Sequence, residues 1–328
     1  MQRVKAIDEK YSAIPRIYLD ISFTKYLLPK KIITASDNVT VYYLNFFTGF
    51  YYILLQLQKA TKVYCHSVYC FVKIVPFIFF FKKHLVVDMH GVVPEETAYQ
   101  NKSKYLVWFY SFYESVIFKS ASAIVCVTNS MVNYYKQKYP LYNGEYFVYT
   151  IMPQNLREYQ FKIPLSTDNI QIIYSGNIQK WQNVDMMLAT IARGKKDDIK
   201  YTILTLAKDA FINMLDEREI DLKAYNIEIT SVVPSGLHEY YVKAHYGFIF
   251  RDDSIVNRVA NPTKLVEYLH YGITPIVLNP FIGDYREYDY VLMEDFDINS
   301  LRPEKSVKNM NVIKLAKQKN DQINIIEI

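Results

Sequence analysis

Short apolar segments of strand length alternate with longer segments of helical pattern along almost the whole chain. Strands are expected at Arg16–Phe23, Val39–Leu44, Lys62–Cys65, His84–Met89, Ala123–Val127, Ile170–Ser175, Tyr201–Leu206, Asn226–Ser231, Gly247–Arg251 and Thr274–Leu278. Helices are expected between them at Gly49–Ala60, Phe71–Lys83, Lys102–Lys119, Ser130–Tyr139, Asn183–Ala192, Lys208–Glu219, Leu237–Ala244 and Thr263–Tyr271. Consecutive strand–helix–strand units require a parallel sheet whose two faces are both covered by helices. The pattern therefore predicts an α/β protein of doubly wound, Rossmann-like architecture.

One segment interrupts this alternation. Residues Met152–Asn169 contain two prolines and a polar Ser-Thr-Asp-Asn cluster, and they show no sustained periodicity. Such a composition is typical of a linker between domains. We expect an N-terminal Rossmann-like domain over residues 1–155 and a C-terminal one over residues 156–328 that ends in a helical tail. The chain begins within an expected helix, Gln2–Tyr11, so the first strand of the N-terminal domain is expected to be missing; a sheet one strand short is the alternative.

The composition restricts the class of protein. The 328 residues are 51% hydrophobic and 22% charged, which is enough apolar material for large cores, and a net charge of +5 is too small to indicate nucleic acid. The three cysteines form no disulfide framework and have no zinc-site spacing, so reduced thiols are expected and a metal is not. No apolar run reaches the roughly 18 residues of a spanning helix, and the N-terminus lacks the apolar segment of a signal peptide. A cytoplasmic protein, soluble or peripheral to the inner face of a membrane, is expected.

The strongest chemical signal lies in the C-terminal half. A buried strand ends at Arg251, a polar loop follows, and a helix is expected to begin at Pro262-Thr263 and to end at Gly272. The first turn of a helix directs free N–H groups and a positive dipole at the crevice above the strand ends, where open parallel sheets bind ligands. Lys264 adds a cation suited to phosphate, and Glu267 can accept hydrogen bonds from two vicinal hydroxyls. Since the two residues are three apart, a solvated charged helix face is equally consistent with the spacing alone.

The same segment resembles a known family. Residues Pro262–Val277 are similar to the donor-binding motif of the family-4 glycosyltransferases, which are retaining enzymes of the GT-B fold. In that family a Glu at the position of Glu267 holds the ribose of a nucleotide sugar, above the helix that Pro262 and Thr263 begin. The resemblance implies a donor site at Thr263, Lys264 and Glu267, with the helix N-terminus facing the diphosphate.

Another stretch of the C-terminal half resembles the same family. Residues Ile172–Asp185 are similar to the first strand and turn of the family's C-terminal domain, where a Gly-Arg turn and a nearby Lys hold the donor diphosphate. Gly176 and Lys180 match this pattern, whereas Asn177 replaces the Arg. The resemblance places these three residues in the donor site.

Two segments of the N-terminal half complete the resemblance. Val86–Glu96 is similar to the segment in which a His or Asp faces the reacting sugar, which makes His90 and Asp88 the candidate catalytic residues. Ala121–Met131, with Glu114 upstream, is similar to a further strand of the family. A hydrogen-bonded structural role is the alternative for His90, and Glu95 and Glu96 are weaker candidates for the acceptor side.

The sequence departs from the family at one place. The family carries a further Glu eight positions before the ribose Glu, where this chain has Val259. Backbone N–H groups of the loop, or Asn257 and Arg258 beside it, are therefore expected to take over that contact. Arg251 at the strand end is a further expected donor-binding residue.

The resemblance implies a fold and a function. The fold is GT-B, with two Rossmann-like domains facing a central cleft. The reaction is transfer of a sugar, of hexosyltransferase type, from a nucleotide-sugar donor to a hydroxyl of a glycan or lipid-linked glycan, with retention and without a metal or other cofactor. Assembly of a surface polysaccharide, capsule or O-antigen is the expected setting. A non-catalytic partner subunit and a GT-B nucleotide-sugar epimerase are the alternatives.

Overall fold

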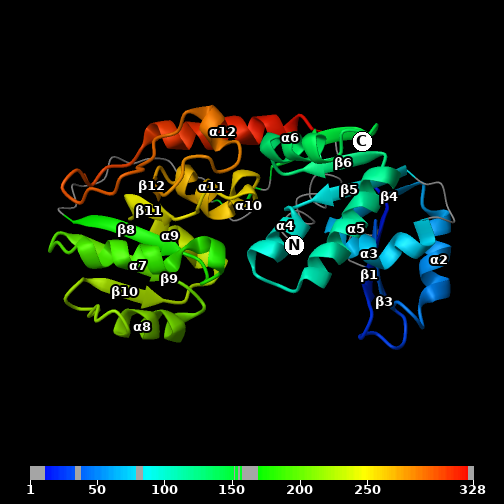
Figure 1. Ribbon diagram of the computed structural model, residues 1–328, viewed down its shortest axis with the longest axis horizontal. Coiled ribbons are helices and arrows are strands. Elements are labelled where there is room, and N and C mark those ends of the chain that lie inside the picture. Colours follow the sequence, from blue (N-terminus) through cyan, green and yellow to red (C-terminus); the bar gives the residue numbers. More distant parts are fainter. Residues whose placement is uncertain are drawn as a thin grey trace. The chain divides into compact units, whose positions relative to one another are not determined.

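The computed structural model describes residues 12–33, 38–78, 84–150, 152–153, 156 and 169–323. The chain divides into two compact units (Figure 1). One extends to residue 149 without residues 128–130, and the other contains residues 128–130 and 150–324. The expected helix Gln2–Tyr11 lies outside the described residues, as does most of the expected linker Met152–Asn169.

The first unit alternates strands and helices, as predicted. Its strands are β1 (Arg16–Ser22), β2 (Lys30–Ile33), β3 (Val39–Asn45), β4 (Lys62–His66), β5 (His84–Met89), β6 (Ala123–Cys126) and β7 (Glu145–Val148). Its helices are α2 (Phe50–Lys59), α3 (Ser67–Ile78), α4 (Val93–Tyr99), α5 (Lys104–Ser120) and α6 (Asn129–Lys138), the first two residues of which group with the second unit.

The strands of the first unit form two sheets rather than one. β4, β5, β6 and β7 pair in this order and are parallel throughout. β1 pairs with β3 in parallel, and β2 runs antiparallel to β3. β2 and β7 were not predicted from the sequence, since both are only four residues long and begin with charged residues, two lysines in β2 and Glu145 in β7. Short edge strands take their conformation from the neighbouring strand more than from local pattern.

The sequence pattern located β5 at its observed bounds, whereas α3 begins earlier than the predicted Phe71. β5 is buried at every position after His84, which is why its apolar run was a clear signal. Ser67, directly after β4, has a φ of +80°, and this left-handed backbone turns the chain into α3 without a loop. Residues 79–83, the C-terminal part of the predicted helix, lie outside the described residues.

The second unit contains a five-stranded sheet. Its strands are β8 (Ile170–Ser175), β9 (Ile199–Leu204), β10 (Ile227–Thr230), β11 (Tyr246–Ile249) and β12 (Thr274–Val277). Its helices are η1 (Lys180–Gln182), α7 (Val184–Arg193), α8 (Lys208–Asp216), η2 (Pro234–Gly236), α9 (Leu237–Tyr241), α10 (Ile255–Arg258), α11 (Thr263–His270), η3 (Tyr285–Tyr288) and α12 (Val307–Asp321). All strand pairs are parallel, in the order β10-β9-β8-β11-β12.

Both faces of this sheet are covered, as a parallel sheet requires. Side chains of α7 and α8 pack with one face of the strands around Tyr174, Phe211 and Phe248. Side chains of α9, α11 and α12 pack with the other face around Tyr241, Leu269 and Ile313. The strand order reverses between β8 and β11, which lie side by side (Figure 1). Their carboxyl ends therefore flank the topological switch point, where sheets of this type bind ligands.

α11 begins at the predicted Thr263 and ends one residue before the predicted Tyr271. Pro262 is the N-cap residue and not part of the first turn, since its ψ of 114° is extended. Gly272 follows the helix with a φ of +66°, the left-handed conformation predicted for its end. Among the described residues, no helix has both the length and the apolar character that crossing a bilayer requires.

Candidate functional site

Lys264 lies at the switch point, in the first turn of α11. Its side chain is buried, with Nζ 3.8 Å from the centroid of the Tyr174 ring and donating a hydrogen bond of 3.0 Å to Gln182 Oε1. Burial lowers the pKa of Lys264 well below its ordinary value, and the nearby Arg251 lowers it further, against the opposing effect of Glu267. The charged form of this lysine is poorly solvated, so a bound anion would stabilise it.

Gly176 provides the space that Lys264 uses. A Cβ at this position would lie 2.8 Å from Lys264 Nζ and 3.2 Å from its Cε. The glycine that follows β8 is therefore required for the close approach of the lysine to the strand end. Its backbone N–H donates to Leu204 O at 2.9 Å, so the turn continues the ladder with β9.

Glu267 lies one turn further along α11 and is held by a hydrogen-bonded chain. Tyr241 OH donates to Glu267 Oε2 at 2.8 Å and lies 2.6 Å from Ser175 Oγ. Burial raises the pKa of Glu267, while the hydrogen bond from Tyr241 and the charge of Lys264 oppose this rise. Three elements, β8, α9 and α11, thus orient one carboxylate beside the strand end.

The sequence analysis did not predict the residues that support Lys264 and Glu267. They are Tyr174, Ser175, Gln182 and Tyr241. Tyr174 and Ser175 end β8, directly before the glycine of the predicted turn. Their position next to this glycine is the one sequence signal that could have identified them. Tyr241 belongs to α9 and reaches Glu267 only through the fold, so no local pattern identified it.

Residues of the polar loop between β11 and α11 form hydrogen bonds and an ion pair with one another. Arg251 Nη1 donates to Asn257 Oδ1 at 3.0 Å, and Asn257 Nδ2 donates to the Asp252 carbonyl at 3.1 Å. Asn257 is fully buried, so its amide orients Arg251 and closes the loop. Arg258 forms an exposed ion pair with Asp253, Nε to Oδ1 at 2.5 Å. Of the two side chains predicted to replace the missing Glu, Asn257 bonds to Arg251 and Arg258 pairs with Asp253. Arg251, predicted as a donor-binding residue, lies close enough to Lys264 to lower its pKa.

The remaining predicted donor residues lie at two turns of the same unit. The Asn177 side chain bonds to Gln179, with Nδ2 donating to Oε1 at 2.9 Å, and the Asn177 carbonyl accepts from Tyr174 OH. Lys180 begins the 3₁₀ turn η1 that precedes α7. Thr263 is the first residue of α11, after the buried Pro262.

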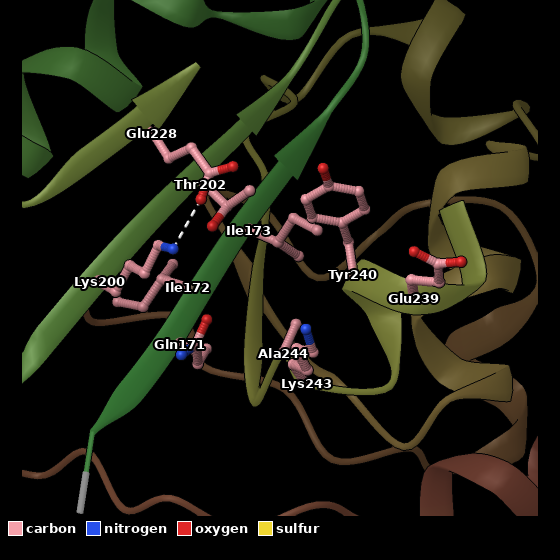
Figure 2. Close-up of a pocket in the computed structure, with 10 residues that line it drawn as sticks. All are labelled: Gln171, Ile172, Ile173, Lys200, Thr202, Glu228, Glu239, Tyr240, Lys243 and Ala244. Carbon is pink, nitrogen blue, oxygen red and sulfur yellow. Dashed lines mark ion pairs between the residues drawn. The ribbon is translucent and has the colours of Figure 1, made fainter. Parts of the chain in front are cut away.

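A hollow of the second unit lies apart from these residues. Figure 2 shows it beside β8 and β9, where Ile173 and Tyr240 face each other and Lys200 forms an ion pair of 2.6 Å with Glu228. Its lining contains none of the predicted donor residues. The ion pair joins the neighbouring strands β9 and β10.

The predicted catalytic residues form a cluster in the first unit. Asp88, in β5, is fully buried, and its Oδ2 lies 3.0 Å from His90 Nε2 and 3.5 Å from His66 Nδ1. The same oxygen accepts a hydrogen bond of 2.9 Å from Tyr64 OH. His90 is 34% exposed, so one edge of its imidazole reaches solvent while the other is held by the carboxylate. The sequence analysis predicted Asp88 and His90 but not His66 or Tyr64.

Glu95 and Glu114 share one lysine partner. Lys138 Nζ donates to Glu95 Oε1 at 2.6 Å and to Glu114 Oε1 at 2.5 Å. Tyr134 OH bonds to the same oxygen of Glu95, and Tyr139 OH donates to Glu114 at 2.8 Å. These carboxylates therefore stabilise the packing of α4, α5 and α6.

The fold is shared with solved glycosyltransferase structures, although no family model and no curated protein sequence matches the chain. Sucrose-phosphate synthase from Thermosynechococcus elongatus aligns at 11% identity with a TM-score of 0.64, over 97% of this chain and 88% of the other. HepE of Anabaena in complex with UDP aligns at 11% identity and a TM-score of 0.61, over 88% and 85%. WaaG, a glycosyltransferase involved in lipopolysaccharide biosynthesis, aligns at 12% identity and a TM-score of 0.51, over 85% and 92%. The chain thus has the GT-B fold, as the resemblance of its motifs implied.

Proposed function

We propose that the protein is a retaining glycosyltransferase that moves a sugar from a nucleotide-sugar donor to an acceptor hydroxyl. The observation that carries this proposal is the arrangement of Lys264 and Glu267 at the β8–β11 switch point of a GT-B fold. A buried cation beside a helix N-terminus suits a diphosphate, and a carboxylate one turn away suits the two hydroxyls of a ribose. Structures of HepE in complex with UDP and with UDP-glucose, which share the fold, support a uridine nucleotide as donor.

The charge of the departing diphosphate is proposed to be balanced by protein groups without a metal. Lys264, Lys180 and the N-terminus of α11 supply the positive charge, with Arg251 held toward the site by Asn257. In glycosyl transfer the leaving group gains negative charge as the bond to the anomeric carbon breaks. Fixed cations and dipoles stabilise that charge most in the transition state, which is where stabilisation accelerates a reaction.

His90 is proposed as the group of the first unit that contacts the transferred sugar. Asp88 Oδ2 lies 3.0 Å from Nε2 at one edge of the imidazole, which leaves the exposed edge for a sugar hydroxyl. Asp88 is fully buried, so its role is to position the imidazole.

The acceptor is proposed to be a glycan or a lipid-linked glycan, in the cytoplasm at the inner face of a membrane, during assembly of a surface polysaccharide. WaaG, which shares the fold, is named for lipopolysaccharide biosynthesis, and this supports the setting. The outer face of α5 supports membrane contact: Tyr105, Trp108 and Phe112 are 66%, 62% and 51% exposed on successive turns. Aromatic side chains flanked by lysines are typical of surfaces that rest on a bilayer.

A binding screen tests the donor assignment. UDP-, GDP-, dTDP- and CMP-sugars are compared by thermal shift, since a ligand that binds only the folded state raises the melting temperature. Glu267→Gln removes the charge of the carboxylate but keeps its shape, and is expected to weaken the preferred donor about 10- to 100-fold. Glu239→Gln, an exposed change on α9, is the matched control and should bind as the wild type does. Unchanged donor affinity in Glu267→Gln would contradict the assignment.

Product analysis with the preferred donor then distinguishes the reaction. Transfer to a glycan acceptor with the anomeric configuration retained is the expected result. Conversion of the donor sugar without an acceptor would instead identify an epimerase, and donor binding without transfer to any of a panel of acceptors would identify a non-catalytic subunit.

A further inference from the structure

Three potential metal ligands meet at the ends of two neighbouring strands in the first unit. His66 and Asp88 are directly opposite each other in the parallel pair of β4 and β5, and His90 follows two residues after Asp88. One ligand atom of each residue, His66 Nδ1, Asp88 Oδ2 and His90 Nε2, lies within 4.8 Å of the other two. Among the residues that the structure describes, this is the one group of three or more His, Cys, Asp or Glu side chains with such a geometry.

The separations of these atoms match the edges of a coordination shell. Asp88 Oδ2 lies 3.0 Å from His90 Nε2 and 3.5 Å from His66 Nδ1. Ligands at roughly 2.1 Å from a tetrahedral zinc ion lie about 3.4 Å from one another. Two imidazoles and a carboxylate form a ligand set that first-row divalent ions accept. We propose that His66, Asp88 and His90 bind one Zn²⁺ ion.

The surroundings of the cluster suit such a site. Tyr64 OH donates to Asp88 Oδ2 at 2.9 Å, which orients the carboxylate as outer-shell partners of metal ligands do. His66 and His90 are 23% and 34% exposed, so the ion can enter from solvent and keep a water ligand on that side. Cys65 belongs to the opposite face of β4 and is buried, which raises the pKa of its thiol and keeps it from competing as a thiolate.

A bound ion would change what His90 can do. Zinc takes the lone pair of His90 Nε2 and holds the ring against Asp88 and His66. In the proposed function this imidazole contacts the transferred sugar, where positive charge develops as the bond to the leaving group breaks. Because the ion would add positive charge beside that sugar, zinc is inferred to inhibit transfer reversibly. The inhibition rests on the proposed function, whereas the binding of the ion does not.

Metal binding is measured first, on untagged full-length protein stripped with chelator. Zn²⁺ is titrated in competition with a chromophoric chelator, and Co²⁺ is titrated while its visible ligand-field bands are recorded. We expect one ion per chain, and at least tenfold weaker binding in His66→Asn, whose amide keeps a donor near Asp88 without an imidazole ligand. His84→Asn, an exposed change at the start of β5, is the control and should bind as the wild type does. Melting temperatures establish that both variants are folded.

The outcomes separate the two parts of the inference. No saturable binding, or equal affinity in His66→Asn and wild type, overturns the zinc site. If zinc binds at the cluster but slows transfer equally in His66→Asn and wild type, the inhibitory role is overturned and the site stands. Absence of transfer with every donor and acceptor contradicts the proposed function and leaves the binding result unaffected. The expected result is zinc inhibition in the wild type and in His84→Asn, at least tenfold weaker in His66→Asn, and reversal by EDTA.

Discussion

At the scale of single residues, Lys264 carries the clearest physical consequence. Its ammonium is buried over the Tyr174 ring and beside Arg251, so its pKa lies well below the ordinary value. A diphosphate bound at this position would favour the charged form and raise that pKa again. Binding must then be accompanied by proton uptake wherever the solution pH exceeds the pKa of the free protein.

This predicts that UDP affinity falls as the pH rises, by up to about tenfold per pH unit above the pKa of free Lys264. Calorimetry above about pH 7.5, where the terminal phosphate is already fully ionised, in two buffers of different ionisation enthalpy measures the proton uptake directly. Lys264→Met should bind UDP weakly and without proton uptake. Lys200→Met, at the surface ion pair with Glu228, is the control. Equal proton uptake in Lys264→Met and in wild type would contradict the role of the lysine.

At the scale of secondary structure, α5 presents two different faces. Its buried face contains Glu114, the one acidic residue of the helix, which bonds to Lys138 and Tyr139. Its outer face presents Tyr105, Trp108 and Phe112 between lysines at the two ends of the helix. The rings of Trp108 and Phe112 are stacked with their centroids 6.2 Å apart, and the two basic residues of the helix, Lys104 and Lys119, lie at its ends.

The predicted consequence is binding to anionic lipid. Wild-type protein should co-sediment with vesicles that contain phosphatidylglycerol, and less with pure phosphatidylcholine or at high salt, because the lysine contribution is screened. Trp108→Ala should lower the fraction bound at least several-fold without changing the melting temperature much, since this side chain is 62% exposed. Leu206→Ala removes an apolar side chain that is 90% exposed in the second unit and is the matched control. Equal losses in both variants would argue against a specific role of α5.

At the scale of the whole molecule, the two units hold different chemical groups. The second unit holds cations and a carboxylate at its switch point, and the first holds an imidazole oriented by a buried carboxylate. Protein cations and a helix N-terminus are proposed to balance the leaving diphosphate, so the transfer rate of the zinc-free enzyme should be unchanged by EDTA. Assays of stripped enzyme with and without Mn²⁺ test this. A rate lost on chelation and restored by Mn²⁺ would show that the diphosphate needs a metal after all.

The sequence alone determined the architecture because its signal is local. Continuous apolar runs identify buried parallel strands, and the predicted bounds of β5 and β8 coincide with those in the structure. The Gly272 position after α11 was likewise predictable, since a helix that ends in the left-handed region favours glycine. Motif resemblance indicated the GT-B fold, which the solved structures confirm. The short strands β2 and β7 escaped prediction because their pairing partners, not their own residues, hold them in place.

Only the tertiary structure decided which side chains meet. Tyr241 reaches Glu267 across 26 residues of sequence, and Tyr64 reaches Asp88 across 24. Such pairs depend on strand order and on the packing of helices over the sheet, and residue periodicity carries no information about either. Asn257 illustrates the same limit: its sequence position suggested a ligand contact, whereas the fold buries it and uses its amide to hold Arg251. Local pattern determined the elements, and the long-range contacts between them determined the chemistry of the sites.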